Sequence, residues 1–392
     1  MNLTSEIVDR IRAAVRPDRL VDTAERLIEV PSPTRSGRAV ANRLAELLTA
    51  DGFEVERPVC GWAEAPAVVT RFTSSRPGRT IQFNGHLDTV HLPFVPPRVE
   101  QGVLYGSGAS DMKGGIAAMV EAVRTLKETG LLPAGGVLLT AHDLHEMPWG
   151  DGSQIDALID SGYVGDGVLL PEYLCDRLPV VGRGLAILEV KISRPGVPVH
   201  ECLGGMEQPN VIAAGAEIIR RMGQLDRELA SRTHPLAGRE SMFIGQAAGG
   251  EIYNQSPIEF RLAGTRRWLA GTRHADVERQ CLDLLAAVAA ETSTQIEGKL
   301  GLVRDAFELD QSHPLVAAFN AATQAAMGRT LPIGAKPFVD DGNTFIARGG
   351  VPAITHGPDA KGAHTVNENV PIAELVRVAV VYALAALAFC QD

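Results

Sequence analysis

Two short segments place candidate metal ligands where a strand ends and where a helix begins, and no other feature constrains the fold as strongly. The first is an apolar run, residues 80–83, that leads into Gly85-His86-Leu87-Asp88. In an extended backbone this spacing puts the imidazole and the carboxylate on the same side, which suits a metal ligand and its supporting acid. The second is Asp111, which follows a Gly-rich turn and precedes a helical stretch, residues 115–126. A carboxylate among small residues at a helix start can reach a metal without steric obstruction.

Strand-like and helix-like patterns alternate from residue 67 to about residue 180. Alternation of this kind predicts an α/β sheet with helices on both faces. Ligand groups at strand ends suit such a sheet, because open α/β sheets bind ligands at the carboxyl edge of their strands. The expected strands are residues 67–72, 80–83, 136–140 and 168–170, and the expected helices are residues 116–129 and 154–161.

The alternating pattern is interrupted after Gly182-Arg183-Gly184 and resumes at about Val303. The interruption predicts an inserted α+β unit with two helices and about four strands. We therefore expect a catalytic domain formed by residues 1–183 and 301–392, and a smaller inserted domain formed by residues 184–300. The clearest elements are strands at residues 186–193, 251–253 and 258–263, helices at 210–222 and 275–291, and a final helix at 372–389.

Composition limits the partners that this chain can have. Its 392 residues exceed one ordinary core, and its net charge of −10 argues against a nucleic-acid binder, which needs a basic face. No uninterrupted run of about 18 apolar residues occurs and residues 1–19 lack the apolar core of a signal peptide, so no membrane association is expected. The cysteines form no Cys-x-x-Cys pair, which favours reduced structural thiols and a cytoplasmic location. They are Cys60, Cys175, Cys202, Cys281 and Cys390.

The segments around His86 and Asp111 resemble the dinuclear-zinc peptidase and amidohydrolase family of acetylornithine deacetylase, succinyl-diaminopimelate desuccinylase and glutamate carboxypeptidase. In that family a Gly-His-x-Asp-x-Val strand end supplies one metal ligand and the acid that orients it. A Gly-x-x-Asp-x-Lys-Gly-Gly turn supplies a carboxylate that bridges two metals. The resemblance implies that His86 is a ligand, that Asp88 orients it and that Asp111 is the bridge. It also implies two Zn²⁺ per subunit, with Co²⁺ or Mn²⁺ as possible substitutes.

The resemblance extends to the C-terminus and implies two further ligands. Glu172 follows the short strand 168–170, where the family places a terminal carboxylate ligand. The segment 357–368 matches the family's Gly-Pro … Ala-His-x-x-Asn-Glu pattern and makes His364 the last ligand. The implied fold is a zinc-peptidase catalytic domain, a mixed sheet flanked by helices, with an inserted ferredoxin-like domain for dimerisation or closure.

One segment departs from the family pattern. The family carries adjacent Glu residues after the strand at 136–140, the first as general base and the second as metal ligand, whereas this chain has His145-Glu146. In one alignment His145 takes the base position and Glu146 the ligand position. A shift of one residue makes Glu146 the base and His145 a ligand, and both arrangements are chemically competent. His142 and Asp143 are the nearest rivals for these roles.

The inserted domain carries the candidate substrate contacts. His200 matches a family histidine that reaches the partner subunit's site across a homodimer, where it stabilises the oxyanion. Asn254 lies in a turn that resembles the family's Asn-x-x-Pro turn. Arg266 or Arg267 could clamp a substrate carboxylate, and Asn343 stands where relatives have a substrate-binding turn.

Together these features predict a metal-dependent hydrolase that cleaves the amide bond of an N-acylated amino acid or short peptide, in the manner of a deacetylase or other deacylase. A dipeptidase or carboxypeptidase of the same family is the nearest alternative. The absence of the Glu-Glu pair also leaves open a non-hydrolytic relative that only binds a ligand.

Overall fold

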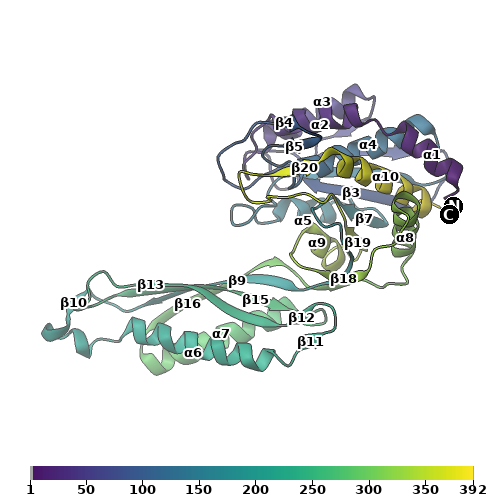
Figure 1. Ribbon diagram of the computed structural model, residues 1–392. Coiled ribbons are helices and arrows are strands. Elements are labelled where there is room, and N and C mark those ends of the chain that lie inside the picture. The colour runs from purple at the N-terminus through teal and green to yellow at the C-terminus, as the bar shows by residue number, and fades with distance from the viewer. Residues whose placement is uncertain (1–2, 392) are drawn as a thin grey trace. The chain divides into compact units, whose positions relative to one another are not determined.

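The computed structural model describes residues 3–391, and these divide into two compact units. The first unit contains the described residues up to Val180, together with Leu309–Gly334 and the chain from Thr344 onward. The second unit consists of Val181–Glu308 and Ala335–Asn343. Figure 1 shows the course of the chain through the helices and strands of each unit.

The boundaries differ from the predicted ones mainly at residues 335–343, which the sequence left with the catalytic domain. In the structure this segment is bonded to the second unit. Arg304 forms a buried ion pair with Asp341 at 2.8 Å, and the side-chain amide of Asn343 donates to the carbonyl of Asp305 at 2.7 Å. These contacts join positions far apart in sequence, which a reading of local pattern does not detect.

A six-stranded mixed sheet forms the centre of the first unit, in the order β1-β2-β6-β3-β7-β19. Strand β3 runs parallel to β6 and β7, and β7 runs parallel to β19, whereas β2 is antiparallel to β6 and to β1. The expected mixed sheet flanked by helices is confirmed. The strands are β1 (Val55–Glu56), β2 (Val68–Thr73), β3 (Thr80–His86), β6 (Gly136–His142), β7 (Gly167–Leu170) and β19 (Ala353–Thr355).

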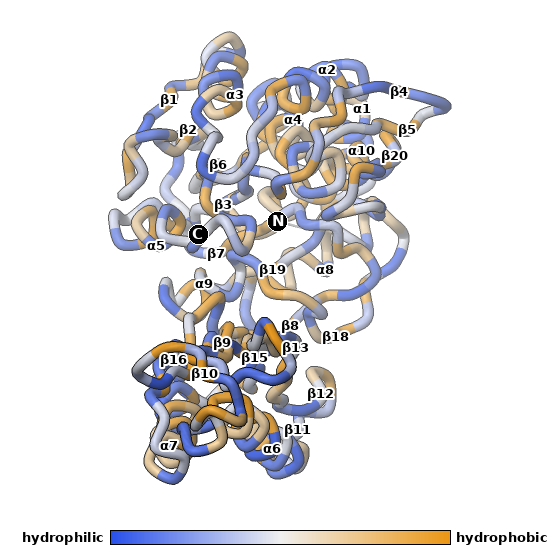
Figure 2. The backbone as a smooth tube through the Cα atoms, turned by 90° about the vertical axis from the view of Figure 1, so that its left-hand side faces the viewer, coloured by the Kyte–Doolittle hydropathy of each residue, from blue (hydrophilic) through white to orange (hydrophobic). Residues whose placement is uncertain are grey.

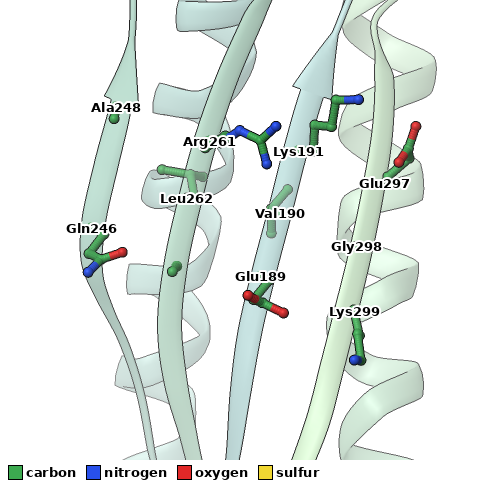
Figure 3. A pocket seen from close by; sticks show the side chains of 11 residues that line it. Glu189, Val190, Lys191, Gln246, Ala248, Arg261, Leu262, Glu297, Gly298 and Lys299 are labelled. Carbon is green, nitrogen blue, oxygen red and sulfur yellow. The ribbon is translucent and has the colours of Figure 1, made fainter. Parts of the chain in front are cut away.

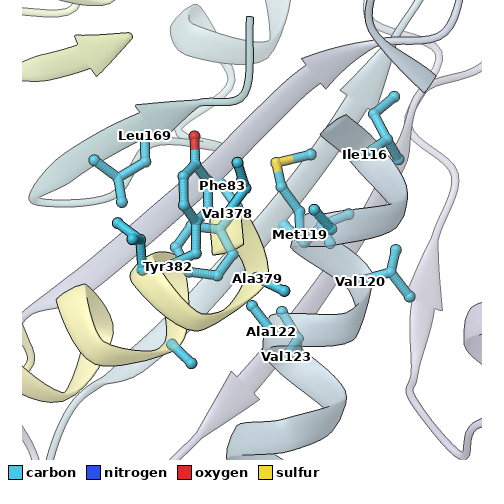
Figure 4. Packing of buried hydrophobic residues seen from close by; sticks show 14 of the residues in the cluster. Phe83, Ile116, Met119, Val120, Ala122, Val123, Leu169, Val378, Ala379 and Tyr382 are labelled. Carbon is cyan, nitrogen blue, oxygen red and sulfur yellow. The ribbon is translucent and has the colours of Figure 1, made fainter. Parts of the chain in front are cut away.

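Two apolar helices pack against this sheet and form its main core. Helix α4 (Lys113–Thr129) and helix α10 (Ile372–Phe389) meet over β3, where the rings of Phe83 and Tyr382 lie 5.0 Å apart (Figure 4). Every residue of α4 from Lys113 to Leu126 is buried. The other helices that contribute to this unit are α1 (Ser5–Ala14), α2 (Pro17–Ile28), α3 (Arg38–Ala50), α5 (Ser153–Asp160), α8 (Pro314–Met327) and α9 (Asp341–Ala347), which begins in the second unit.

Helix α10 is long and apolar enough to cross a membrane by length and composition, alone among the described helices. However, 67% of it is buried inside the protein, as in the core helix of a globular unit. Figure 2 shows its hydrophobic residues beside the polar edge of the small sheet β20-β5-β4. That sheet contains β4 (Arg98–Glu100), β5 (Val103–Tyr105) and β20 (Asn369–Pro371), and a further sheet, β17-β8-β18, contains β8 (Leu178–Gly182), β17 (Phe307–Glu308) and β18 (Ile333–Lys336).

The second unit is an antiparallel four-stranded sheet, β13-β15-β9-β16, with helices α6 (Val211–Leu229) and α7 (His274–Thr292) packed against it. Alternate residues of β9, from Ala186 to Ile192, point into the core that the helices cover. The strands are β9 (Gly184–Ser193), β13 (Ser241–Gly249), β15 (Glu259–Trp268) and β16 (Gln295–Arg304), with short pairs β10 (Val199–His200) and β14 (Gln255–Ser256), and β11 (Thr233–His234) and β12 (Gly238–Arg239).

The strand predicted at residues 251–253 is wrong, because the structure has a bend and a turn there. The edge strand is β13 instead, which was not predicted from the sequence. Its second half, from Gly245 to Gly249, consists of small and polar residues on an exposed edge and has no apolar alternation.

The first turn of α4 packs so closely on the end of β7 that it tolerates only glycine at one position. A Cβ on Gly115 would lie 2.5 Å from the carbonyl oxygen of Pro171. We predict that Gly115→Ala lowers the free energy of unfolding of the first unit by about 1–3 kcal/mol, the usual range for overpacking. Thermal or urea unfolding of the variant measures this.

Gly223 in α6 is the matched control for that substitution. Its Cβ would have only the tip of Arg227 within reach, at 3.9 Å. Gly223→Ala should therefore stabilise the second unit by about 0.5–1 kcal/mol through helix propensity alone. A neutral or stabilising effect of Gly115→Ala would show that the contact with Pro171 relaxes without cost.

Candidate metal centre

The parallel strands bring the candidate ligands to one edge of the central sheet. Strands β6, β3 and β7 are neighbours, and His86 is the last residue of β3. The His145-Glu146 pair follows β6, and Glu172 follows β7 two residues after its end. Because parallel strands end at the same edge, side chains far apart in sequence converge there.

Asp111 lies between two histidines and presents one carboxylate oxygen to each. Its Oδ1 is 3.0 Å from Nε2 of His86, and its Oδ2 is 3.2 Å from Nε2 of His364. The other oxygen-bearing neighbour of His364 is Glu146, whose Oε2 lies 3.2 Å from the same nitrogen. His86, Asp111 and Glu146 are buried, whereas the His364 side chain is 51% exposed. This is the arrangement expected of a carboxylate that bridges two cations.

Glu172 and His145 lie on the His86 side of the cluster. Oε1 of Glu172 is 3.7 Å from Nε2 of His86 and 3.8 Å from Nε2 of His145. The two imidazole rings are stacked, with centroids 4.0 Å apart and planes inclined by 3°. We call His86, Asp111, His145, Glu146, Glu172 and His364 the ligand cluster.

The stacking separates the roles of His145 and Glu146. An imidazole binds a metal along the lone pair of its nitrogen, in the ring plane and at about 2.0–2.1 Å. One ion cannot lie in the planes of two parallel rings 4 Å apart, so His145 in this rotamer does not share an ion with His86. The donor atoms of His86, His145 and Glu172 nonetheless lie within 4.8 Å of one another, as do those of His86, Asp111 and Glu146. Glu146, which also contacts His364, is therefore placed as a candidate ligand. Of the two sequence alignments, the geometry favours the one in which His145 takes the base position.

Asp88 contacts the last residue of β3 and two residues that follow β6, and only some of these contacts match its predicted role of orienting His86. The Nδ1–H of His86 donates to the backbone carbonyl of Asp88 at 2.9 Å, while the nearer carboxylate oxygen is 3.6 Å away. This bond leaves Nε2 of His86 free to face Asp111. The Asp88 carboxylate instead accepts hydrogen bonds from the N–H groups of His145 at 3.1 Å and Glu146 at 3.0 Å. Asp88 therefore also positions the His145-Glu146 pair.

The chemistry of the cluster fits divalent metal ions. Burial and the nearby charge of Asp111 raise the pKa of Glu146, because two carboxylates face each other away from water. Hydrogen bonds to Asp111 and Glu146 raise the pKa of His364 to about 10. The metal-free cluster thus needs protons to balance its carboxylates, and a bound cation would take their place. Imidazole and carboxylate donors are a mixture that zinc accepts.

His142 and Asp143, the other candidates at the end of β6, contact residues outside the ligand cluster. Asp143 accepts hydrogen bonds from the N–H groups of Arg35 and Gly37 and from the indole of Trp62, so it anchors a neighbouring loop. The Nδ1 of His142 bonds to the backbone oxygen of Asp143, and its ring lies beside Asn84. Neither residue belongs to a group of potential metal ligands among the described residues.

In the second unit, the structure brings two of the predicted substrate residues together. The side chains of His200 and Asn254 lie 3.0 Å apart, and His200 also contacts Glu201 at 3.1 Å. His200 is exposed, at the end of the unit where β10 and β14 pair (Figure 1). An exposed histidine that its own unit does not enclose is available to another surface.

The structure does not support substrate contacts for two of the predicted residues. Arg266 is fully buried and paired with Glu240 at 2.6 Å, so it stabilises the core of the second unit. Asn343 is also fully buried and uses its amide to hold the carbonyl of Asp305. Arg267 remains. It lies beside Arg183, burial and that charge lower its pKa, and no carboxylate among the described residues pairs with it.

A hollow of about 620 Å³ lies on the open face of the second unit's sheet (Figure 3). No residue of the ligand cluster lines it. Its rim carries charges of both signs, Glu189, Lys191, Arg261, Glu297 and Lys299. Because Arg261 is already paired with Glu259 at 2.6 Å, and the charges are mixed, this surface favours no particular ligand.

Glu368 lies inside the matched segment 357–368 but was not predicted from the sequence to contribute to the site. Its carboxylate accepts hydrogen bonds from the turn that carries Asp111. The Asn-Glu end of that segment was the available signal. Burial raises the pKa of Glu368 to about 7.

If Glu146 is the ligand and His145 the base, replacing Glu146 should affect metal binding, whereas replacing His145 should affect turnover. Glu146→Gln should lower the occupancy of one metal, because a neutral amide oxygen is a weaker ligand than a carboxylate. His145→Ala should retain both metals and lose about 10²–10⁴-fold in turnover, the usual contribution of proton transfer. Metal analysis by mass spectrometry and turnover of each metal-loaded variant measure both effects.

Full metal content with lost turnover in Glu146→Gln would reverse the assignment. Wild-type behaviour of both variants would exclude the pair, and His142 and Asp143 would then be tested in the same way.

Comparison with known proteins adds a family match to this geometry. Residues 82–388 match the family described as Peptidase family M20/M25/M40. The chain is 26% identical over 405 residues to N-formyl-4-amino-5-aminomethyl-2-methylpyrimidine deformylase of Bacillus subtilis, covering 92% of each chain. It is 28% identical over 384 residues to a putative succinyl-diaminopimelate desuccinylase of Mycobacterium tuberculosis, covering 91% of this chain and 94% of the relative. The crystal structure of the aminopeptidase PepT from Bacillus cereus has a TM-score of 0.79 and 20% identity, covering 96% of this chain and 99% of that one.

Proposed function

Because the chain belongs to peptidase family M20/M25/M40 and is therefore a metal-dependent hydrolase, we propose that it uses two zinc ions to cleave the amide bond of an N-acylated amino acid. The observation that carries the proposal is the position of Asp111, with one carboxylate oxygen toward His86 and the other toward His364. A carboxylate whose two oxygens face different histidines suits a site for two metal ions better than a site for one. The deformylase and desuccinylase relatives, which are named for removing acyl groups, support the reaction class.

The ligand cluster would hold the two ions as separate sets that share Asp111. His86 and Glu172 would bind one ion, and Glu146 and His364 would bind the other. Once bound, the ions would polarise the scissile carbonyl and lower the pKa of an attacking water. Asp88 keeps His86 and the His145-Glu146 backbone in place through its carbonyl and its carboxylate.

His145 would move the proton in the reaction. Its ring stacks on His86 and its Nε2 faces Glu172, so it lies beside the predicted metals without needing to bind one. A neutral imidazole there can accept a proton from water and pass it to the nitrogen of the departing amine. This is the work that a carboxylate performs in the family pattern.

Arg267 and Arg183 support an amino acid, rather than a simple amine, as the leaving half of the substrate. Burial lowers the pKa of both arginines, with a further contribution from the charge of Arg183 at Arg267 and from the charge of Arg239 at Arg183. Neither arginine has a carboxylate partner among residues 3–391, so the pair forms a favourable place for an anion. The α-carboxylate of an N-acyl amino acid would supply that anion.

We further propose a homodimer in which the second unit contacts another copy of the chain. Its edge strand β13 has unpaired backbone groups and an exposed Phe243. The end that carries His200 exposes large apolar side chains, including Leu203, Met206 and Tyr253, of which Tyr253 is 100% exposed. Apolar side chains beside an unpaired edge strand are typical of association surfaces. From the partner, His200 would stabilise the oxyanion that forms on the scissile carbonyl.

The proposed location is the cytoplasm. All five cysteines are unpaired in the structure, which suits a reducing compartment.

A substrate series tests the proposed function. Zinc-loaded protein should hydrolyse N-formyl, N-acetyl or N-succinyl amino acids faster than dipeptides, and Asp111→Ala should lose both metal and activity. Preferential cleavage of dipeptides would favour the dipeptidase alternative. Full metal loading without hydrolysis of any compound in the series would favour the non-hydrolytic alternative.

Arg267→Ala should raise KM for N-acyl amino acids by about tenfold to a hundredfold, because hydrogen bonds to charged groups contribute about 1.5–3 kcal/mol. The corresponding N-acyl amino amides, which lack the carboxylate, should be unaffected. Arg261→Ala, on the same strand, is the control, since Arg261 is already paired with Glu259. An equal rise in KM for acid and amide substrates would show that Arg267 does not bind the substrate carboxylate.

Mixing two inactive variants tests the dimer. His200→Ala keeps its ligand cluster, and Asp111→Ala keeps its His200, so a mixed dimer contains one complete site if His200 acts across the interface. Activity should return when the subunits exchange. No recovery after exchange, verified with differently tagged subunits, would mean that His200 acts within its own subunit or not at all.

A further inference from the structure

Glu368 is a buried residue whose carboxylate accepts hydrogen bonds from the turn that carries Asp111. Its Oε1 accepts a hydrogen bond from the N–H of Gly108 at 3.1 Å. Its Oε2 accepts three more, from the N–H of Ser110 at 3.2 Å, the hydroxyl of Ser110 at 3.0 Å and the N–H of Asp111 at 3.1 Å. Only 4% of Glu368 is exposed. Four donors of one turn therefore depend on a side chain from the opposite end of the chain.

The backbone around Glu368 is fixed as well. Its carbonyl accepts a hydrogen bond from the N–H of Gly106 at 3.3 Å, and the next residue begins β20, which pairs with β5. Lys361 and Asn369 exchange two backbone hydrogen bonds of 2.9 Å, which close the loop between them. Glu368 thus stands where this closed loop meets the turn of Asp111.

His364 lies within the same loop, four residues before Glu368, and has little packing of its own. Its side chain is 51% exposed, and its backbone is held in the left-handed region, with φ of 60°. Its contacts with Asp111 and Glu146, both 3.2 Å, therefore depend on how the loop is attached. Glu368 is the buried side chain that attaches the loop to the turn of Asp111.

We propose that Glu368 is a positioning residue that fixes the spacing between Asp111 and His364, and thereby sets the affinity for the metal ion that these two residues would share. The inference rests on the proposed function. Glu368 is not itself a ligand, because its two oxygens are directed at donors of the turn. Partners of this kind, one contact removed from the metal, typically change its affinity about 10–100-fold when they are replaced.

The central experiment compares Glu368→Gln with wild type in the full-length, metal-depleted protein. Zinc affinity is measured by competition with a chromophoric chelator, and the unfolding midpoint of the metal-free protein is recorded in parallel. A glutamine keeps the size of the side chain, but turns an NH₂ group toward the N–H donors of the turn and removes the charge. We expect zinc affinity to fall about 10–100-fold.

Glu121→Gln is the matched control, since it makes the same chemical change at a buried carboxylate of the same unit. Glu121 pairs with Arg19 at 2.9 Å and lies outside the ligand cluster. This variant should lower the unfolding midpoint and leave zinc affinity unchanged. Ser110→Ala removes only one of the four donors to Glu368 and should weaken zinc binding several-fold.

The outcomes separate this inference from the proposed function. Wild-type protein that binds no zinc would overturn the proposed function and, with it, the role of Glu368. Zinc binding by wild type with equal affinity in Glu368→Gln would overturn the positioning role alone. If Glu368→Gln does not fold, Ser110→Ala decides: unchanged zinc affinity in that variant, measured in folded protein, overturns the inference.

Discussion

Asp111 presents one oxygen to His86 and the other to His364, and the ligand cluster is arranged around that division. Glu172 approaches from the His86 side and Glu146 from the His364 side. Three carboxylates buried this close together repel one another unless protons or cations lie between them. The surrounding elements hold these carboxylates in place against their repulsion. They are three parallel strand ends, the start of a buried helix and the backbone amides that donate to Asp88 and Glu368.

Local pattern in the sequence was sufficient for the parts of the site that local structure determines. The strand end at His86 and the helix start after Asp111 could be predicted from spacing alone. Glu172 and His364 required a family resemblance, because nothing near them identifies a ligand. Arg266 and Arg267 could not be distinguished, since alternation along a strand says that they point to opposite faces but not which face is buried. The ion pair of Arg266 with Glu240 decides this only in three dimensions.

The roles of His145 and Glu146 could not be distinguished from the sequence either. Both alignments were chemically reasonable, and the distinction came from the parallel planes of two rings. The substitution of imidazole for a carboxylate also changes the charge of the centre. Asp111, Glu146 and Glu172 would face two divalent ions with three negative charges. The ions would then face one negative charge fewer than with a carboxylate in place of His145, which favours substrates and transition states that carry negative charge.

The ligands of the centre begin at His86 and end at His364, with the positioning carboxylate at Glu368 and the covering helix α10 later still. The second unit is contained almost entirely in Val181–Glu308. During synthesis, most of that unit leaves the ribosome before the last ligand has been made. A chain that ends before His364 therefore lacks the contacts that His364 and Glu368 make with Asp111. The centre can thus be assembled only after His364 and Glu368 have both been synthesised.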